Sequence, residues 1–154
     1  MPSILLAADH GGYLLKEALK EHLTQQGFEI IDVGCHSLDA VDYPAVTEGA
    51  LLRLKAEGIE QGKIRGILCC GSGVGVCIAA NRFPFARAVW VNDLSTALWS
   101  RRHNDCNILC FGGRVTAAHR ACEITDAWLA EPFDGDRHQP RVNELGQLGQ
   151  TVRC

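Results

Sequence analysis

Residues 66–81 read GILCCGSGVGVCIAAN, and this stretch decides the fold. Its first five residues are uniformly apolar, which is typical of a parallel strand covered on both faces. Three glycines follow at alternating positions within residues 71–75, and mainly small, apolar residues continue to residue 81. The pattern predicts a buried strand, a tight glycine-rich turn and a helix, which together are a unit of an open α/β sheet.

Strand and helix patterns of the same kind alternate on both sides of this stretch. Strands are predicted at residues 3–8, 28–33, 66–70, 86–91 and 107–111, and helices at 13–26, 44–57, 76–81, 93–103, 117–129 and 139–145. The alternation predicts an α/β fold: a three-layer α/β/α sandwich around a five-stranded parallel, Rossmann-like sheet. We expect residues 1–146 to form a single domain and residues 147–154 a C-terminal tail.

The composition excludes several functional classes. The 154 residues carry a formal net charge of −3, whereas a general nucleic-acid binder would be basic. No apolar run approaches the roughly 18 residues that a membrane-spanning helix needs. The N-terminal stretch lacks the positively charged region of a secretory signal. We therefore expect a cytoplasmic protein with no nucleic-acid or membrane partner.

Eight cysteines are many for a chain of this kind. Most of them lie within apolar runs, and a domain of this length does not need cross-links, so we expect reduced thiols rather than disulfides. The sequence contains no C-x-x-C pair and no zinc-finger spacing of histidine and cysteine. It therefore predicts no metal site.

The glycine-rich turn at residues 71–75 is the strongest local signal of a ligand site. Glycine lets ligand oxygens approach backbone N–H groups, and the start of a helix adds partial positive charge. The turn can therefore bind an anion or an oxyanion, with a plain strand-to-helix turn and a dinucleotide loop as the alternatives. Asp93 lies where a dinucleotide fingerprint has its acid, but residue 76 is valine where that fingerprint has glycine.

Cys70 and two histidines are candidate chemical groups. Cys70 lies where the strand ends and the turn begins. A helix N-terminus at this place would stabilise a thiolate, which could act as a nucleophile or a base. The alternative is that Cys70 is a buried cysteine with a packing role only. His10 follows the first strand, and His103 lies between a helix and the fifth strand. Histidine moves protons near neutral pH, and we expect both histidines at the same sheet edge as Cys70. A structural role is the alternative for each histidine taken alone.

Arg137 and Arg141 form a cationic segment near the C-terminus of an acidic protein. They are four residues apart and share one face if the segment is helical. Two guanidinium groups on one face suit a phosphate, and a solvated helix end is the alternative.

Five motifs occur in order along the chain: AADHGG at 7–12, VDYP at 41–44, CGSGVGVCIAAN at 70–81, RRHNDCNILCFGGR at 101–114 and DRHQPRV at 136–142. Together they resemble the ribose-5-phosphate isomerase B family, which also includes galactose-6-phosphate and allose-6-phosphate isomerases. The resemblance extends from residue 4 to residue 145. It implies an aldose–ketose isomerase that acts on a sugar phosphate without a metal or a cofactor. It also implies a homodimer or tetramer whose active site is shared between subunits.

The resemblance further implies roles for individual residues. Cys70 corresponds to the base that moves a proton between C1 and C2 through an enediolate, and His103, with Ser72, corresponds to the group that assists ring opening. The substrate-binding positions correspond to Asp9, His10, Tyr43, Gly71, Gly73, Val74, Gly75, Asn104 and Arg114. Among them, the residues of the glycine-rich turn would hold the enediolate oxygens through their backbone N–H groups. The phosphate-binding positions correspond to His10, Arg137 and Arg141.

Several alternatives stay open. Ala45 stands where relatives often have an acid, and Cys106 replaces a residue that is usually small. One branch of the family has glutamate at the position of Val76, so Cys70 is the only matching base here. Pentose and hexose phosphates share this machinery, so an isomerase of allose or galactose 6-phosphate is one alternative. A non-catalytic sugar-phosphate-binding module is another, and a thiol redox protein with Cys77 as resolving cysteine is a third.

Overall fold

A computed structural model describes residues 1–149, and residues 150–154, the end of the predicted tail, lie outside the described residues. The strands are β1 (Ser3–Ala8), β2 (Ile30–Asp32), β3 (Ile64–Cys70), β4 (Ala88–Trp90) and β5 (Ile108–Gly112). The helices are α1 (Tyr13–Gln25), α2 (Tyr43–Ala56), the 3-10 turn η1 (Ile59–Gln61), α3 (Val74–Ala80), α4 (Leu94–Asn104), α5 (Ala118–Ala130) and α6 (His138–Leu145). All strand pairs are parallel, in the order β2-β1-β3-β5-β4.

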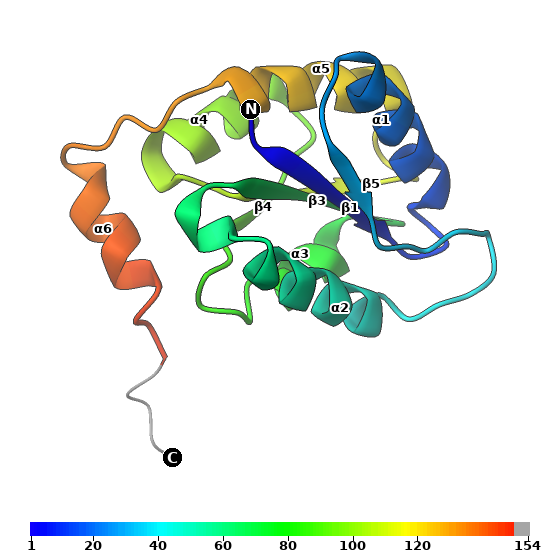
Figure 1. Cartoon of the computed structure of the whole chain (residues 1–154), viewed down its shortest axis with the longest axis horizontal. Coiled ribbons are helices and arrows are strands. Elements are labelled where there is room, and N and C mark those ends of the chain that lie inside the picture. The colour runs from blue at the N-terminus through cyan, green and yellow to red at the C-terminus, as the bar shows by residue number, and fades with distance from the viewer. Residues whose placement is uncertain (150–154) are drawn as a thin grey trace.

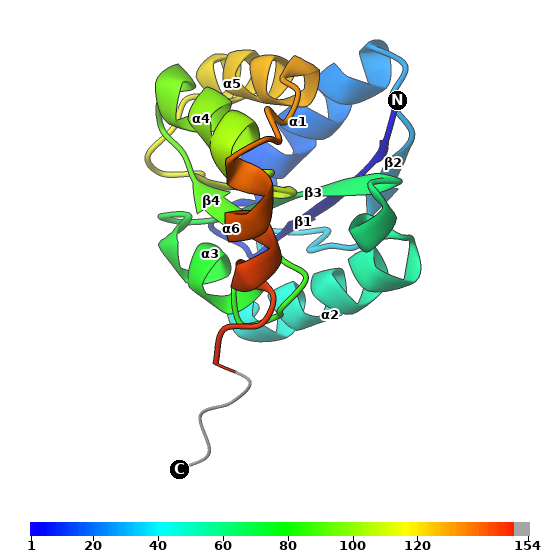
Figure 2. The ribbon, with the colours of Figure 1, turned by 90° about the vertical axis from the view of Figure 1, so that its left-hand side faces the viewer.

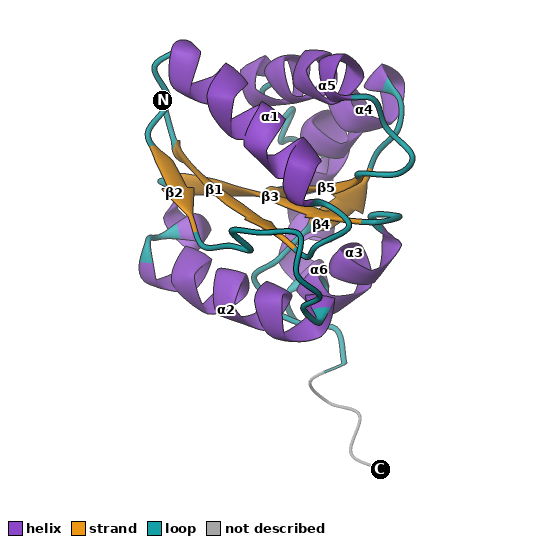
Figure 3. Cartoon of the chain, turned by 90° about the vertical axis from the view of Figure 1, so that its right-hand side faces the viewer, coloured by secondary structure: helices purple, strands orange, loops and turns teal. Residues whose placement is uncertain are grey.

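The sheet is the middle layer of three. Helices α1, α4 and α5 cover one face (Figure 1), and α2 and α3 cover the other (Figure 3). Side chains alternate along the strands, so Cys69 packs in the core on the α1 and α5 side and Cys70 on the α2 and α3 side. Helix α6 stands outside these layers and contacts α4 (Figure 2). The predicted α/β/α sandwich with a five-stranded parallel sheet is confirmed.

The element boundaries differ from the predicted ones in a few places. β2 and β4 have three residues each, because these edge strands pair with β1 and β5 over only that length. Helix α3 begins at Val74 rather than at residue 76, since the turn already ends at Gly73. Asp93 caps α4, and its carboxylate accepts a hydrogen bond from the Thr96 N–H over 2.8 Å. Within residues 1–149 we find no helix with the length and apolar character that crossing a bilayer requires.

The strand order creates a topological switch between β1 and β3. From β1 the chain moves to β2 on one side, whereas from β3 it moves to the opposite edge strand, β4, and then returns to β5 between them. Ligands of open α/β sheets bind at the carboxyl ends of the strands beside such a switch. The loops found there are residues 9–12 after β1 and residues 71–73 after β3.

These two loops touch each other through glycines. A Cβ atom added at Gly11 would lie 2.9 Å from the Cα and N atoms of Gly71. A Cβ atom added at Gly12 would lie 2.4 Å from the carbonyl carbon of Cys69, which belongs to β3. Only glycine therefore lets the β1 loop pack against β3 at this edge.

We expect Gly12→Ala to destabilise the fold by about 3 kcal/mol, because the added methyl group would push on a strand held by ladders on both sides. Gly49→Ala is the control: this residue lies inside α2, and no atom lies within 4 Å of its added Cβ. That control should stabilise the protein by about 0.5–1 kcal/mol. Urea denaturation measures both free energies of unfolding, and equal values would contradict the close packing.

Candidate active site

Cys70 lies at the carboxyl end of β3 with only 4% of its surface exposed. The backbone N–H of Gly73 donates a hydrogen bond to Cys70 Sγ over 3.1 Å. Gly73 has a φ of 82°, and a Cβ atom there would lie 2.7 Å from the backbone of Phe111. The loop thus places a backbone N–H donor directly at the sulfur of Cys70.

Cys69, one residue earlier, has a different environment. Its side chain is completely buried in the core on the opposite face of the sheet. Burial raises the pKa of Cys69 far above its usual value, so its sulfur stays protonated. The two adjacent cysteines are therefore not equivalent, and only Cys70 meets the glycine-rich loop.

The turn after Cys70 leaves several backbone donors available. Within residues 1–149, the N–H groups of Gly71, Ser72 and Gly75 donate no hydrogen bond to the protein. The Val74 N–H donates to Ser72 Oγ over 3.2 Å, so the exposed serine hydroxyl is held beside the loop. Free N–H groups on a loop of fixed shape can stabilise an oxyanion.

The loop after β1 is shaped by Asp9. Its buried carboxylate accepts hydrogen bonds through Oδ1 from the N–H groups of Gly11, over 2.9 Å, and Gly12, over 3.2 Å. His10 is partly exposed, and its Nδ1 accepts from the Val41 N–H over 3.3 Å. His10 therefore joins the β1 loop to the segment before α2.

Tyr43 and Arg114 border the same loop. The Tyr43 ring lies 2.8 Å from the position that a Cβ atom would take at Gly75, and Arg114 Nη1 lies 3.1 Å from that position at Gly71. Both side chains are exposed. We call the residues at this edge of the sheet the carboxyl-edge group: Asp9, His10, Tyr43, Cys70, Gly71, Ser72, Gly73, Val74, Gly75 and Arg114.

His103 and Asn104 lie at the other edge of the sheet. Helix α4 starts beyond the carboxyl end of β4 and runs back, so its last residues precede the amino end of β5 (Figure 1). The expectation that His103 shares an edge with Cys70 inside one chain is therefore wrong. The reason is the geometry of parallel crossovers, in which each helix returns the chain to the amino edge.

Arg137 and Arg141 lie with His103, because α6 contacts α4. His138, which the sequence pattern does not single out beyond its place in DRHQPRV, connects the two helices. Its ring stacks on the His103 ring with centroids 4.5 Å apart, and its buried Nε2 has no hydrogen-bond partner among the described residues. Burial lowers the pKa of His138, and the positive charges of Arg137, His103 and Arg141 add to this effect. We call these residues, with Asn104, the amino-edge group.

One cluster within residues 1–149 has the residue types of a metal site. The ligand atoms of His103, Asp134 and His138 lie within 4.8 Å of one another. However, the two imidazole planes are only 15° apart and stacked, so the lone pairs in those planes do not converge on one ion. Arg137 and Arg141 add positive charge beside His138. The arrangement therefore suits an anion better than a cation.

Most of the other cysteines in the described residues are buried or pack against the core. The seven cysteines in the described residues are free thiols. Burial raises the pKa of Cys106 to about 11, which fits a packing role. A hydrogen bond from the Cys110 thiol lowers the pKa of Cys77 to about 7, and Cys77 Sγ also contacts the Ala88 carbonyl over 3.7 Å. Cys77 therefore faces Cys110 and β4 rather than Cys70.

A cavity of about 440 Å³ adjoins the amino-edge group. Asn104 and Ser100 of α4 line it on one side, and residues 81–84 line it on another. Leu145 and Leu148, at and beyond the end of α6, complete its wall. The chain thus has room beside Asn104 for a ligand or for a segment of another subunit.

The parallel sheet with helices on both faces defines a Rossmann-like α/β protein, and the buried cysteine and glycine-rich loop at its switch point make the carboxyl edge the candidate ligand site. The family model described as Ribose/Galactose Isomerase matches residues 4–145. The chain therefore belongs to the ribose/galactose isomerase family, and the resemblance noted in the motifs is confirmed.

Known proteins agree with this membership. Ribose-5-phosphate isomerase B of Escherichia coli is 40% identical over 150 residues, covering 97% of this chain and 98% of that protein. The structure of ribose-5-phosphate isomerase B from Clostridium thermocellum has a TM-score of 0.89 at 39% identity, covering 96% of this chain and 97% of the other. The Mycoplasma genitalium enzyme with bound ribulose-5-phosphate has a TM-score of 0.90 at 34% identity, covering 97% of each chain.

Proposed function

We propose that this chain interconverts ribose 5-phosphate and ribulose 5-phosphate. The single observation that carries the proposal is Cys70, held by the Gly73 N–H in a loop with free backbone donors at the switch point of the sheet. The relatives named ribose-5-phosphate isomerase B, and the bound ribulose-5-phosphate in one of them, support the choice of substrate.

Cys70 acts as the base in this proposal. Its thiolate removes the proton from C2 of the open-chain aldose, and Cys70 then delivers a proton to C1. A hydroxyl proton moves from O2 to O1, so the product is an isomer and no electron is gained or lost. The N–H groups of Gly71, Ser72 and Gly75 stabilise the enediolate oxygens while charge is on them.

The remaining carboxyl-edge residues bind and orient the sugar. Asp9 holds the shape of the β1 loop, and His10, Tyr43 and Arg114 present polar atoms around Cys70. The amino-edge group supplies ring opening through His103 and sugar binding through Asn104. Arg137 and Arg141, together with His10, bind the phosphate, which fixes the remote end of the substrate.

We propose that the two groups meet across subunits of a homodimer or tetramer. Seven residues of β3 separate the two edges of the sheet, a length of about 20 Å, which is far more than a pentose phosphate spans. Val74 and Ile78, four residues apart on α3, are 49% and 55% exposed, and Trp90 of β4 is 39% exposed. An apolar surface beside the Cys70 loop suits contact with a second copy of the chain.

Two simpler proposals follow from the same family membership. We propose that residues 1–146 act as one domain, because every strand of the described chain joins one sheet. We also propose that the protein works in the cytoplasm, where its cysteines stay reduced.

Purified protein tests the proposed reaction directly. We expect conversion of ribose 5-phosphate to ribulose 5-phosphate in the presence of EDTA, measured beside allose 6-phosphate and galactose 6-phosphate. Faster turnover of a hexose phosphate would keep the mechanism and change the substrate. Binding of the sugar phosphates by folded protein with no turnover of any of them would favour the binding module instead.

A further inference from the structure

The residue that follows His103 and Asn104 has an unusual backbone conformation. Asp105 ends α4 with φ 46° and ψ 43°, in the left-handed region that residues with a Cβ atom rarely adopt. This conformation turns the chain sharply out of α4 and into β5. The orientation of the last turn of α4, which carries His103, therefore depends on what holds Asp105.

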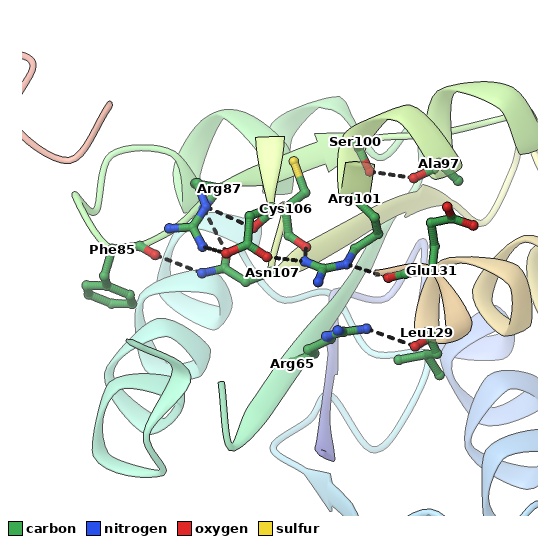
Figure 4. Close-up of polar contacts among 11 residues, drawn as sticks. Arg65, Phe85, Arg87, Ala97, Ser100, Arg101, Cys106, Asn107, Leu129 and Glu131 are labelled. Carbon is green, nitrogen blue, oxygen red and sulfur yellow. Dashed lines mark hydrogen bonds and ion pairs between the residues drawn. The ribbon is translucent and has the colours of Figure 1, made fainter. Parts of the chain in front are cut away.

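Two arginines from different elements, Arg87 and Arg101 (both labelled in Figure 4), hold Asp105. Arg87, just before β4, donates through Nε to the Asp105 carbonyl over 2.8 Å and through Nη2 to its carboxylate over 2.9 Å. Arg101 of α4 donates through Nη1 to the other carboxylate oxygen over 2.7 Å. Both carboxylate oxygens and the carbonyl of one residue are thus bound by two guanidinium groups.

Arg101 extends this clamp to the segment that leads to α6. It is 5% exposed and also donates to the carbonyls of Cys106, over 2.7 Å, and Glu131, over 3.3 Å. The next residue, Arg102, pairs with the Glu131 carboxylate, and its carbonyl accepts from the Asp134 N–H over 3.0 Å. The end of α4 and the start of α6 are therefore bound to the same network.

A second layer of positive charge supports the clamp. Arg65 at the start of β3 donates to the Leu129 carbonyl over 3.1 Å (Figure 4). The guanidinium groups of Arg65 and Arg101 lie over the Trp128 ring, 5.1 Å and 5.8 Å from its centroid. The negative charge of the Asp105 carboxylate offsets part of the cost of burying the Arg65 guanidinium group beside Arg101.

We propose that Asp105, clamped by Arg87 and Arg101, is a positioning residue that holds His103 in the orientation needed for ring opening. The proposal rests on the proposed function, in which His103 assists that step. Asp105 acts only through the end of α4, and its carboxylate is fully engaged by the two arginines. Two guanidinium groups, each of which can donate more than one hydrogen bond to the same residue, fix this short turn more tightly than the backbone alone.

The chemistry of the two sugars separates this role from a purely structural one. Ribose 5-phosphate is mainly a ring and must open before C2 can lose its proton. Ribulose 5-phosphate cannot close into a furanose, because its O5 carries the phosphate. Exchange of its C1 proton with deuterated water therefore needs proton transfer at Cys70 but no ring step.

The test compares these two rates in Asp105→Asn and Asp105→Gly. Asparagine tolerates the left-handed conformation without the charge, and glycine adopts it freely without any side chain. We expect both variants to lose about tenfold or more in kcat for ribose 5-phosphate. Deuterium exchange into ribulose 5-phosphate should stay within about twofold of the original rate, since the Cys70 loop is untouched.

Glu57→Gln is the matched control. Glu57 also follows the end of a helix, α2, and pairs over 2.7 Å with Arg53, four residues earlier, as Asp105 pairs with Arg101. It should change neither rate. Parallel loss of both rates in the Asp105 variants, or recovery of full activity with glycine, would overturn the proposal. If the original protein shows neither isomerisation nor exchange, the proposed function itself has failed.

Discussion

Replacing Cys70 with alanine should lower kcat for ribose 5-phosphate by about 10³-fold, which corresponds to about 4 kcal/mol of transition-state stabilisation. In the proposed mechanism Cys70 takes the proton from carbon, and the Gly73 N–H donates a hydrogen bond to its sulfur. Cys70→Ser should be similarly inactive, because a hydroxyl group in the same place is not ionised at neutral pH. Turnover is measured with the sugar phosphate in excess, so that kcat is isolated.

Cys69→Ala separates the chemical role from packing. Cys69 is even more deeply buried than its neighbour but faces the other half of the core. Either alanine variant leaves a small void, at a cost of about 1–2 kcal/mol in unfolding free energy. We expect only Cys70→Ala to lose turnover, while thermal unfolding shows both proteins folded. Equal activity of the two variants would contradict a proton-transfer role for Cys70.

Much of the fold was predictable from local patterns. The predicted strand at residues 3–8 has the same bounds in the structure, because residues 4–8 form an apolar run that is buried between the helix layers. The alternation of Cys69 and Cys70 between faces follows from the two-residue period of a strand. The exact start of α3 was missed because the positive φ of Gly73 depends on contact with the backbone of Phe111, which is far away in the sequence.

The site was less predictable because its parts come from different edges of the sheet. Motif order alone does not show that the residues at the end of α4 face away from Cys70. His138 was missed because its significance lies in stacking on His103, 35 positions earlier in the sequence. The clamp on Asp105 was missed for the same reason, since Arg87 is 18 residues away and no local pattern joins the two.

Mixing two inactive variants should restore activity if the proposed sharing between subunits is right. Cys70→Ala damages the carboxyl-edge group, and His103→Ala damages the amino-edge group. In a dimer containing one chain of each, one site carries both lesions and the other carries none. Random association makes half of the dimers mixed, so about a quarter of the original sites should be active.

The experiment uses chains that are co-expressed with different tags, and activity is measured before and after the mixed species is isolated. A mixture of Cys70→Ala with Cys70→Ser is the control, because every site in that mixture lacks the thiol and should stay inactive. Since Cys70 and His103 lie at opposite edges of one sheet, no rearrangement within a folded chain brings them together. Failure of the mixed dimer to regain activity would therefore contradict the proposed sharing of the site between subunits, and full activity of His103→Ala by itself would remove the proposed role of His103.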